Sequence, residues 1–144
     1  MSEKWTIDPG FDLEGFLALP LVARVACSGP SVRPVWFVWE DGCFWWLTGS
    51  WSRLPAVLAR DPRVALVVDT CDLETGRVLQ VTAVGEAAAR PFDAARARRK
   101  LARYLGPDEA TWDKARFGLK TLETGSAQFV RLAPQTLRAR DLSY

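Results

Sequence analysis

The sequence predicts a mainly β protein, an antiparallel β-barrel with short helices and six or seven strands. Two observations favour this fold class. Short runs rich in β-branched and aromatic residues recur along the chain, and turn signals separate them. These runs do not alternate regularly with helical segments, as they would in a doubly wound sheet. With 144 residues, 49% of them hydrophobic and 25% charged, the chain is expected to form one domain over residues 1–144.

The first third of the chain predicts one helix and three strands. Residues 12–18 are expected to form a short helix with Asp12 as its N-cap, and Pro20 ends it. Apolar patterning predicts the strands, which are 21–28, 32–39 and 43–48. The pair Asp41 and Gly42 lies between the last two, so these two strands are expected to form a hairpin.

The rest of the chain predicts four more strands and three helical segments. Ser52 is expected to cap a helix within residues 53–61, with Pro55 in its first turn. The further strands are expected at 63–69, 76–91, 126–133 and 137–142, and the further helices at 93–105 and 110–117. Gly85 interrupts the longest of these strands and is expected to mark a bulge or bend.

The absence of histidine limits the chemistry that the side chains can perform alone. It excludes a Ser-His-Asp triad, Cys-His catalysis and a histidine-rich metal site. Cys27, Cys43 and Cys71 are odd in number and widely spaced, which favours buried apolar residues over disulfides or a metal cluster. No metal site is expected and no catalytic residue is indicated, so an enzymatic activity would depend on a cofactor.

Charge and hydropathy favour a cytoplasmic protein that binds neither membranes nor nucleic acid. The formal net charge is +2, and the N-terminal segment has no apolar signal core. The segment ARARRKLAR, residues 95–103, is the strongest hint of the alternative, nucleic-acid binding. On a helix, its basic side chains are expected to lie on the solvent side, opposite Ala97 and Leu101.

Five of the seven tryptophans lie between Trp36 and Trp51. Both strands of the predicted hairpin are apolar on both faces, and a barrel interior covers only one of these faces. The second face is expected to pack in the core or against a subunit partner, or to line an aromatic cofactor. The following segment TGSWSR, residues 48–53, combines hydroxyls, a glycine and an arginine before a helix, which is typical of phosphate sites and also of ordinary helix caps.

These segments together resemble a known family. The sequence RPVWFVWEDGCFWWLTGSWSRLPAVLARDPRVALVVD is similar to the signature region of the pyridoxamine 5'-phosphate oxidase-like, FMN-binding split-barrel superfamily. The resemblance runs from about Leu19 to Arg90 and depends on TGSWSR, ARDPRVALVVD and RVLQV in that order. It implies a split β-barrel that forms a homodimer, with the cofactor bound at the subunit interface.

The resemblance also implies a set of cofactor-binding residues. The residues implied to line the isoalloxazine ring are Pro34, Val35, Trp36, Phe37 and Val38. The others are Leu47 and Thr48 at the ribityl or phosphate end, Ser52 and Arg53 at the phosphate, and Gln80 beside the flavin.

Departures from the superfamily pattern narrow the implied activity. Leu54 stands where the phosphate motif commonly continues with lysine, and the C-terminal Arg-x-His-Asp segment of true vitamin B6 oxidases is missing. Oxidation of pyridoxamine phosphate is therefore not expected. The implied cofactor is FMN, and the alternative is the deazaflavin coenzyme F-420, because deazaflavin-binding branches carry a strand similar to RPVWFVW.

The sequence thus favours a flavin- or deazaflavin-dependent oxidoreductase that acts on a small organic substrate. The cofactor would supply hydride or electron transfer, while the protein positions it and excludes water. The alternative is a non-catalytic split-barrel module that binds a flavin or an apolar ligand. The absence of a lysine at position 54 is the feature that suggests this second function.

Overall fold

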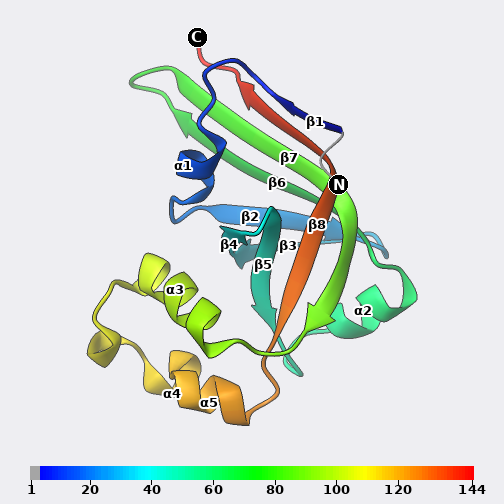
Figure 1. Cartoon of the computed structure of the whole chain (residues 1–144), viewed down its shortest axis with the longest axis vertical. Helices are drawn as coiled ribbons and strands as arrows, with labels where there is room; N and C mark the ends of the chain where they lie inside the picture. The colour runs from blue at the N-terminus through cyan, green and yellow to red at the C-terminus, as the bar shows by residue number, and fades with distance from the viewer. Residues whose placement is uncertain (1–3) are drawn as a thin grey trace.

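The fold is a curled, mostly antiparallel β-sheet of the split-barrel type (Figure 1). The computed structural model describes residues 4–144. Its strands are β1 Lys4–Ile7, β2 Val22–Cys27, β3 Ser31–Trp36, β4 Val38–Glu40, β5 Cys43–Thr48, β6 Arg63–Asp72, β7 Arg77–Arg90 and β8 Gln128–Asp141. Their order is β3-β2-β6-β7-β8-β5-β4, and β1 pairs in parallel with β8. The predicted fold class is confirmed, although the described residues form eight strands in place of six or seven.

Short helices flank the sheet. They are α1 Leu13–Leu17, α2 Leu54–Arg60, α3 Ala94–Leu105, α4 Lys114–Phe117 and α5 Leu119–Thr124, with a 3-10 turn at Glu109–Thr111. Figure 1 shows α3, α4 and α5 grouped at the lower end of the molecule. Asp12 caps α1 as predicted, since its side chain accepts the N–H of Gly15. The residue before α2 is Arg53, whose side chain makes no capping hydrogen bond. The predicted Ser52 provides the cap, because its hydroxyl accepts the N–H of Leu54 at 3.1 Å.

The single strand predicted over residues 32–39 is wrong, because the chain bends at Phe37. β3 pairs with β2, whereas β4 pairs with β5 and forms the predicted hairpin. At the bend, the hydroxyl of Tyr104 accepts the N–H of Phe37 at 3.1 Å and donates to the carbonyl of Leu21 at 2.6 Å. A side chain of α3 therefore satisfies a main-chain group that lacks a partner strand at this point.

The two strands predicted at 126–133 and 137–142 are one continuous strand, β8. Pro134 lies between them and has no N–H to donate. The sheet accommodates this proline because β8 changes neighbours there. β5 pairs with β8 only as far as Leu132, and β1 pairs with it only from Thr136 onward.

The bulge predicted at Gly85 is confirmed. The register between β7 and β8 shifts between Val84 and Gly85. A Cβ atom at Gly85 would clash with the carbonyl oxygen of Ala133, so a side chain cannot be placed there without moving the backbone. The bulge bends two of the longest strands, which helps the sheet to curl.

Three of the clustered tryptophans, Trp39, Trp45 and Trp46, are buried members of the hydrophobic core. Trp39 and Trp45 are 9% and 8% exposed. Their indole N–H groups donate to the Glu14 carboxylate and to the main-chain carbonyl of Glu40. These two residues therefore serve packing, as one of the sequence interpretations required.

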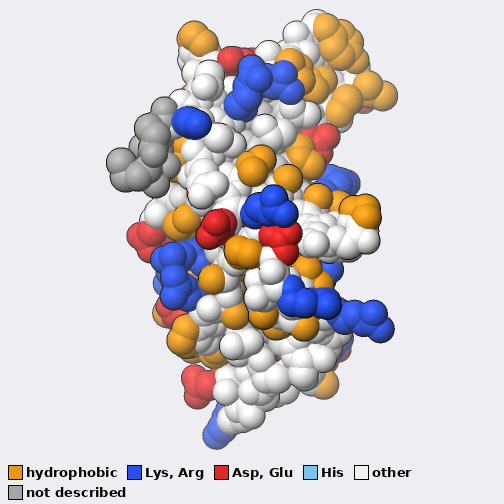
Figure 2. Space-filling view, turned by 90° about the vertical axis from the view of Figure 1, so that its right-hand side faces the viewer, with side chains coloured by type: hydrophobic (Ala, Val, Ile, Leu, Met, Phe, Trp, Pro, Cys, Tyr) orange, Lys and Arg blue, Asp and Glu red, His pale blue; other side chains and the backbone are white. Residues whose placement is uncertain are grey.

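The remaining expectations concern cysteines, metals and the surface. Cys27 and Cys43 are buried as expected, but Cys71 is exposed, because it lies near the end of β6, beyond the part of that strand that faces the core. Between residues 4 and 144, no group of three or more acidic or cysteine side chains could hold a metal ion. No helix of the described chain is long and apolar enough to cross a bilayer. Figure 2 shows basic, acidic and hydrophobic side chains interspersed on one face of the molecule.

Candidate functional site

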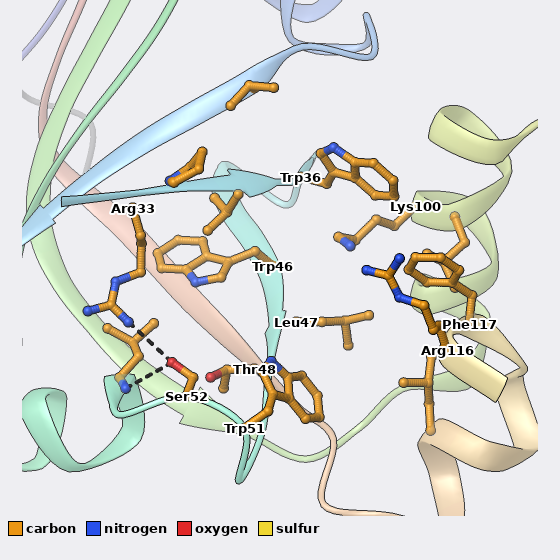
Figure 3. A pocket seen from close by; sticks show the side chains of 16 residues that line it. Arg33, Trp36, Trp46, Leu47, Thr48, Trp51, Ser52, Lys100, Arg116 and Phe117 are labelled. Carbon is orange, nitrogen blue, oxygen red and sulfur yellow. Dashed lines mark hydrogen bonds between the residues drawn. The ribbon is translucent and has the colours of Figure 1, made fainter. Parts of the chain in front are cut away.

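A cavity of about 890 Å³ lies between β3, β5 and the helices α3, α4 and α5 (Figure 3). The strands and the loop after β5 contribute Val22, Arg33, Pro34, Val35, Trp36, Trp46, Leu47, Thr48, Trp51, Ser52 and Leu54. The helices contribute Lys100, Leu101, Arg116, Phe117 and Leu122. A lining of this kind, mainly apolar and aromatic with few polar groups, is typical of small-molecule pockets.

Aromatic side chains form much of the cavity wall. Trp36 stacks on Tyr104 with the ring centroids 4.8 Å apart and the planes 3° from parallel. Phe117 continues the stack on Trp36 at 6.0 Å. Trp46 is 1% exposed, whereas Trp51 is 62% exposed and lies where the cavity meets solvent. Trp36, Trp46 and Trp51 therefore line one cavity.

Polar groups converge at one end of the cavity. Arg33 donates to the hydroxyl of Ser52 at 3.2 Å (Figure 3). Within the described chain, three buried polar atoms of this region have no hydrogen-bond partner: Arg33 Nε, Trp46 Nε1 and Thr48 Oγ1. Buried polar atoms without a partner cost free energy, and native structures rarely leave them so. Together with Ser52, these atoms form a set of hydrogen-bonding groups suited to a polar ligand.

The cavity carries positive charge without compensating acids. Arg33, Lys100 and Arg116 line it, and none of the lining residues is an aspartate or glutamate. Lys100 is only 5% exposed, and burial lowers its pKa from 10.5 to about 8. The prediction that the basic side chains of residues 95–103 face solvent is therefore wrong for Lys100. It is also wrong for Arg96, whose side chain is 13% exposed.

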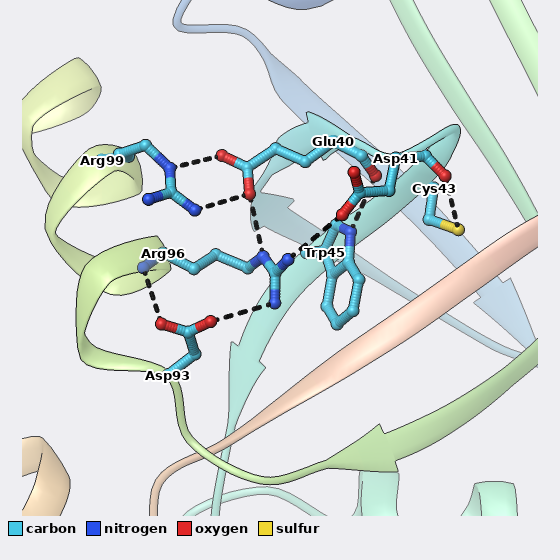
Figure 4. Close-up of polar contacts among 7 residues, drawn as sticks. All are labelled: Glu40, Asp41, Cys43, Trp45, Asp93, Arg96 and Arg99. Atoms are coloured by element: carbon cyan, nitrogen blue, oxygen red, sulfur yellow. Dashed lines mark hydrogen bonds and ion pairs between the residues drawn. The ribbon is translucent and has the colours of Figure 1, made fainter.

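Arg96 fastens α3 to the hairpin of β4 and β5 (Figure 4). Its guanidinium group lies 2.9 Å from Glu40, 3.6 Å from Asp41 and 3.4 Å from Asp93. It also lies 3.5 Å from the ring centroid of Trp45. A hydrogen bond from Arg99 and then one from Arg96 lower the pKa of Glu40 below its usual value, against the opposing effect of burial. Lys100 follows Arg96 by about one helical turn, so this cluster fixes where Lys100 enters the cavity.

The structure brings together six of the residues implied by the family resemblance. These are Pro34, Val35, Trp36, Leu47, Thr48 and Ser52, which all line the cavity. Phe37 and Val38 are fully buried in the core behind it. Arg53 is exposed at the start of α2, and Gln80 lies on β7, where its side chain accepts a hydrogen bond from Arg140 at 2.7 Å. Neither Arg53 nor Gln80 lines the cavity of this chain.

Ten lining residues were not among the predicted site residues: Val22, Arg33, Trp46, Trp51, Leu54, Lys100, Leu101, Arg116, Phe117 and Leu122. Lys100 had a signal, because it follows Ala97 by three positions and precedes Leu101 and Tyr104 on the same helical face. Arg116 and Phe117 had none, because their place depends on how α4 packs in the tertiary structure.

The sequence pattern of the pyridoxamine 5'-phosphate oxidase family matches residues 12–139. No curated protein is significantly similar to the chain in sequence. Solved structures share the fold. A conserved hypothetical protein from Mycobacterium tuberculosis has a TM-score of 0.64 and 21% identity, over 89% of this chain and 84% of that one.

Two further structures are similar to the chain. An F420 reductase has a TM-score of 0.59 and 22% identity, over 88% of this chain and 96% of that one. An FAD-binding protein from Mesorhizobium loti has a TM-score of 0.58 and 19% identity, over 90% and 93% of the two chains. At these identities, the likeness shows a common fold.

Proposed function

The chain belongs to the pyridoxamine 5'-phosphate oxidase family, and we propose that its cavity binds a flavin-type cofactor, FMN or coenzyme F-420, for an oxidoreductase reaction on a small organic substrate. The observation that carries this proposal is the combination of aromatic walls with unpaired buried polar atoms. A flavin or deazaflavin presents a planar ring system and a phosphate, and each needs one of these two kinds of surface.

The residues present fit such a group. Ser52, Thr48 and Arg33 would hold the phosphate end, because they supply two hydroxyls and a guanidinium group at one end of the cavity. Trp36 and Trp46 would border the ring system, and the indole N–H of Trp46 is free to donate to it. Leu54 is 1% exposed and carries no charge. Arg33 would supply the positive charge at the phosphate that the family pattern commonly places on a lysine at position 54.

When bound, the cofactor supplies hydride transfer. The chain's own residues would orient the cofactor and exclude water from it. Pro34, Val35 and Leu47 provide apolar surface around the ring, and the buried Phe37 and Val38 hold β3 and β4 in place behind it. Pyridoxamine phosphate itself is not the proposed substrate, since the Arg-x-His-Asp segment is missing.

We further propose that the protein is a homodimer with the cofactor at the subunit interface. β3 is an edge of the sheet, and it exposes Val32 by 70% beside the cavity residue Pro34. Trp51 is also largely exposed at the cavity opening. A second copy would cover these side chains, and it would also allow Arg53 or Gln80 to reach the cofactor of the partner subunit.

Titration of FMN and of coenzyme F-420, followed by visible absorption, tests the cofactor site. The variant Thr48→Val is expected to weaken binding by about tenfold, because it removes one hydrogen bond to the phosphate end. It is not expected to lower the melting temperature, since the Thr48 hydroxyl has no partner within the described residues. The control Thr136→Val, on β8 outside the cavity, is expected to bind like the wild type.

A different measurement distinguishes the second candidate function, a binding module without turnover, from the oxidoreductase. The reduced cofactor is mixed with the protein and a set of electron acceptors, and its oxidation is followed. Tight binding without protein-dependent oxidation of the cofactor would favour the module. Binding of neither cofactor would contradict both functions.

A further inference from the structure

Lys100 is a buried cation without a partner. It projects from α3 into the cavity, is 5% exposed, and makes no hydrogen bond or ion pair with any residue between 4 and 144. Burial alone accounts for the lowered pKa of its ammonium group, so no nearby acid compensates its charge. A buried charge without compensation is costly and is usually retained for a function.

The surroundings of Lys100 suit an anion attached to an apolar body. Arg116 lines the same end of the cavity, and Figure 3 shows both side chains directed into it. The Lys100 Nζ atom lies 5.7 Å from the ring centroid of Trp36, which stacks on Phe117. Two cations therefore lie beside a flat aromatic surface, and no acidic side chain lines the cavity.

This end of the cavity is distinct from the end assigned to the cofactor phosphate. Figure 3 shows Arg33 and Ser52 on one side of the cavity and Lys100, Arg116 and Phe117 on the other, with Leu47 between them. A single phosphate cannot neutralise cations at both ends. The buried charge of Lys100 at the other end is therefore available to a second anionic group.

We propose that Lys100, with Arg116, forms a subsite for the carboxylate of an organic acid whose apolar body lies against Trp36 and Phe117. The proposal rests on the proposed function in one respect, that this acid is the substrate presented to the cofactor. A carboxylate is favoured because the cation that is buried at this end, Lys100, carries one positive charge, which one carboxylate neutralises.

The test compares two naphthalene ligands, one with a carboxylate and the other with a neutral hydroxymethyl group in its place. 2-Naphthoate and the neutral 2-naphthalenemethanol are titrated into the full chain at pH 7 by calorimetry. The naphthoate is expected to bind at least tenfold more tightly than the alcohol. In the variant Lys100→Met, which keeps the length and apolar stem of the side chain, this preference is expected to vanish. The control Lys120→Met changes the same charge on α5, outside the cavity, and is expected to keep the preference.

Several results would overturn the proposal. One is equal binding of the two ligands by the wild type, which needs no variant to be informative. Another is a preference that survives in Lys100→Met. A third is a tenfold loss of FMN or coenzyme F-420 affinity in Lys100→Met, which would assign Lys100 to the cofactor.

The outcomes for the two proposals can be told apart. If neither cofactor binds but naphthoate binding depends on Lys100, the carboxylate subsite stands and the flavin proposal fails. If a cofactor binds and naphthoate binding does not depend on Lys100, the subsite fails and the flavin proposal stands.

Inorganic phosphate, titrated in the same way, is expected to compete weakly with naphthoate. Benzoate is titrated as the carboxylate competitor for comparison, and competition by phosphate as strong as that by benzoate would show a general anion site and contradict the choice of a carboxylate.

Discussion

At the scale of single residues, two side chains of α3 do opposite things for stability. Tyr104 satisfies main-chain groups at the bend between β3 and β4, and its ring stacks on Trp36. Lys100 occupies the same face of the helix, yet it brings an unpaired charge into the cavity. The first stabilises the fold and the second costs stability, so the helix combines a structural and a functional requirement.

Tyr104→Phe is expected to lower the free energy of unfolding by about 1–3 kcal/mol, because it leaves the N–H of Phe37 and the carbonyl of Leu21 without their partner. The phenylalanine ring can still stack on Trp36, so the loss reports on the hydroxyl. Chemical denaturation measures it. Tyr144→Phe is the control, since Tyr144 is 81% exposed, and it is expected to have no effect. A stable Tyr104→Phe variant would mean that the bend does not need this hydroxyl.

Lys100→Met is expected to raise the free energy of unfolding at pH 7 by up to about 3 kcal/mol. The lowered pKa, about 8 against 10.5, sets this scale at roughly 1.4 kcal/mol per pKa unit. Between pH 8 and 10.5 the unfolded chain holds more protons at this lysine than the folded chain does. The stability of the wild type therefore rises over this interval, and the advantage of the methionine variant shrinks.

Urea unfolding of both proteins at pH 7 and at pH 10 measures this difference. Of the titratable groups near Lys100, burial raises the pKa of Tyr104. The difference between the proteins thus reports mainly on Lys100. A methionine variant that is less stable than the wild type at pH 7 would contradict the account of Lys100 as an uncompensated charge.

At the scale of secondary-structure elements, α3 is held over the cavity by its ion pairs to the hairpin of β4 and β5. Arg96 is the buried member and Arg99 the exposed one, with side chains 13% and 52% exposed. Both contact Glu40. Arg96 also stacks on Trp45, so its substitution is expected to cost more stability than that of Arg99.

Arg96→Met is expected to lower the free energy of unfolding by about 2–4 kcal/mol, because it removes a guanidinium group that is only 13% exposed and leaves the partly buried Glu40 with one partner fewer. Arg99→Met removes a pairing of the same carboxylate from the surface, and it is expected to cost at most about 1 kcal/mol. Thermal and chemical unfolding of the two variants provides the comparison. Equal losses would show that burial of Arg96 does not matter.

Local signals predicted the elements whose cause is local. The side chain of Asp12 caps the helix that begins at the next residue by accepting the N–H of Gly15, and Gly85 forms a bulge where a side chain has no room. The bend at Phe37 could not be predicted, because the group that makes it possible is the Tyr104 hydroxyl, 67 positions along the chain. Pro134 suggested a strand end, but the tertiary structure tolerates it where β8 changes partner strands.

The residues of the candidate site also divide into those with a local sequence signal and those whose place depends on the tertiary structure. Trp36, Thr48 and Ser52 follow one another closely in sequence, and the family resemblance pointed to them. The positively charged residues that line the cavity were not predicted. Arg33 lies on β3, just before the residues predicted to line the ring, and Lys100 was placed with the solvated arginines around it because sequence neighbours on a basic helix look alike. Only the helical face that it shares with Leu101 distinguishes it.

At the scale of the whole molecule, the cavity lies between the curled sheet and the helical group, and it opens beside the edge strand β3 (Figure 1, Figure 3). The sheet supplies the polar end and the helices supply Lys100 and Arg116. This arrangement keeps the proposed cofactor and substrate groups on different parts of the fold. The helical group can therefore vary in substrate preference while the sheet retains the cofactor site.

The central claim is that this cavity holds a flavin-type cofactor. The most direct measurement is the equilibrium titration of FMN, and separately of coenzyme F-420, with the purified protein, followed by quenching of the cofactor's own fluorescence. We predict saturable binding of one of the two at one molecule per chain, with quenching by the tryptophans Trp36 and Trp46. Unchanged fluorescence of both cofactors up to high protein concentration would contradict the claim.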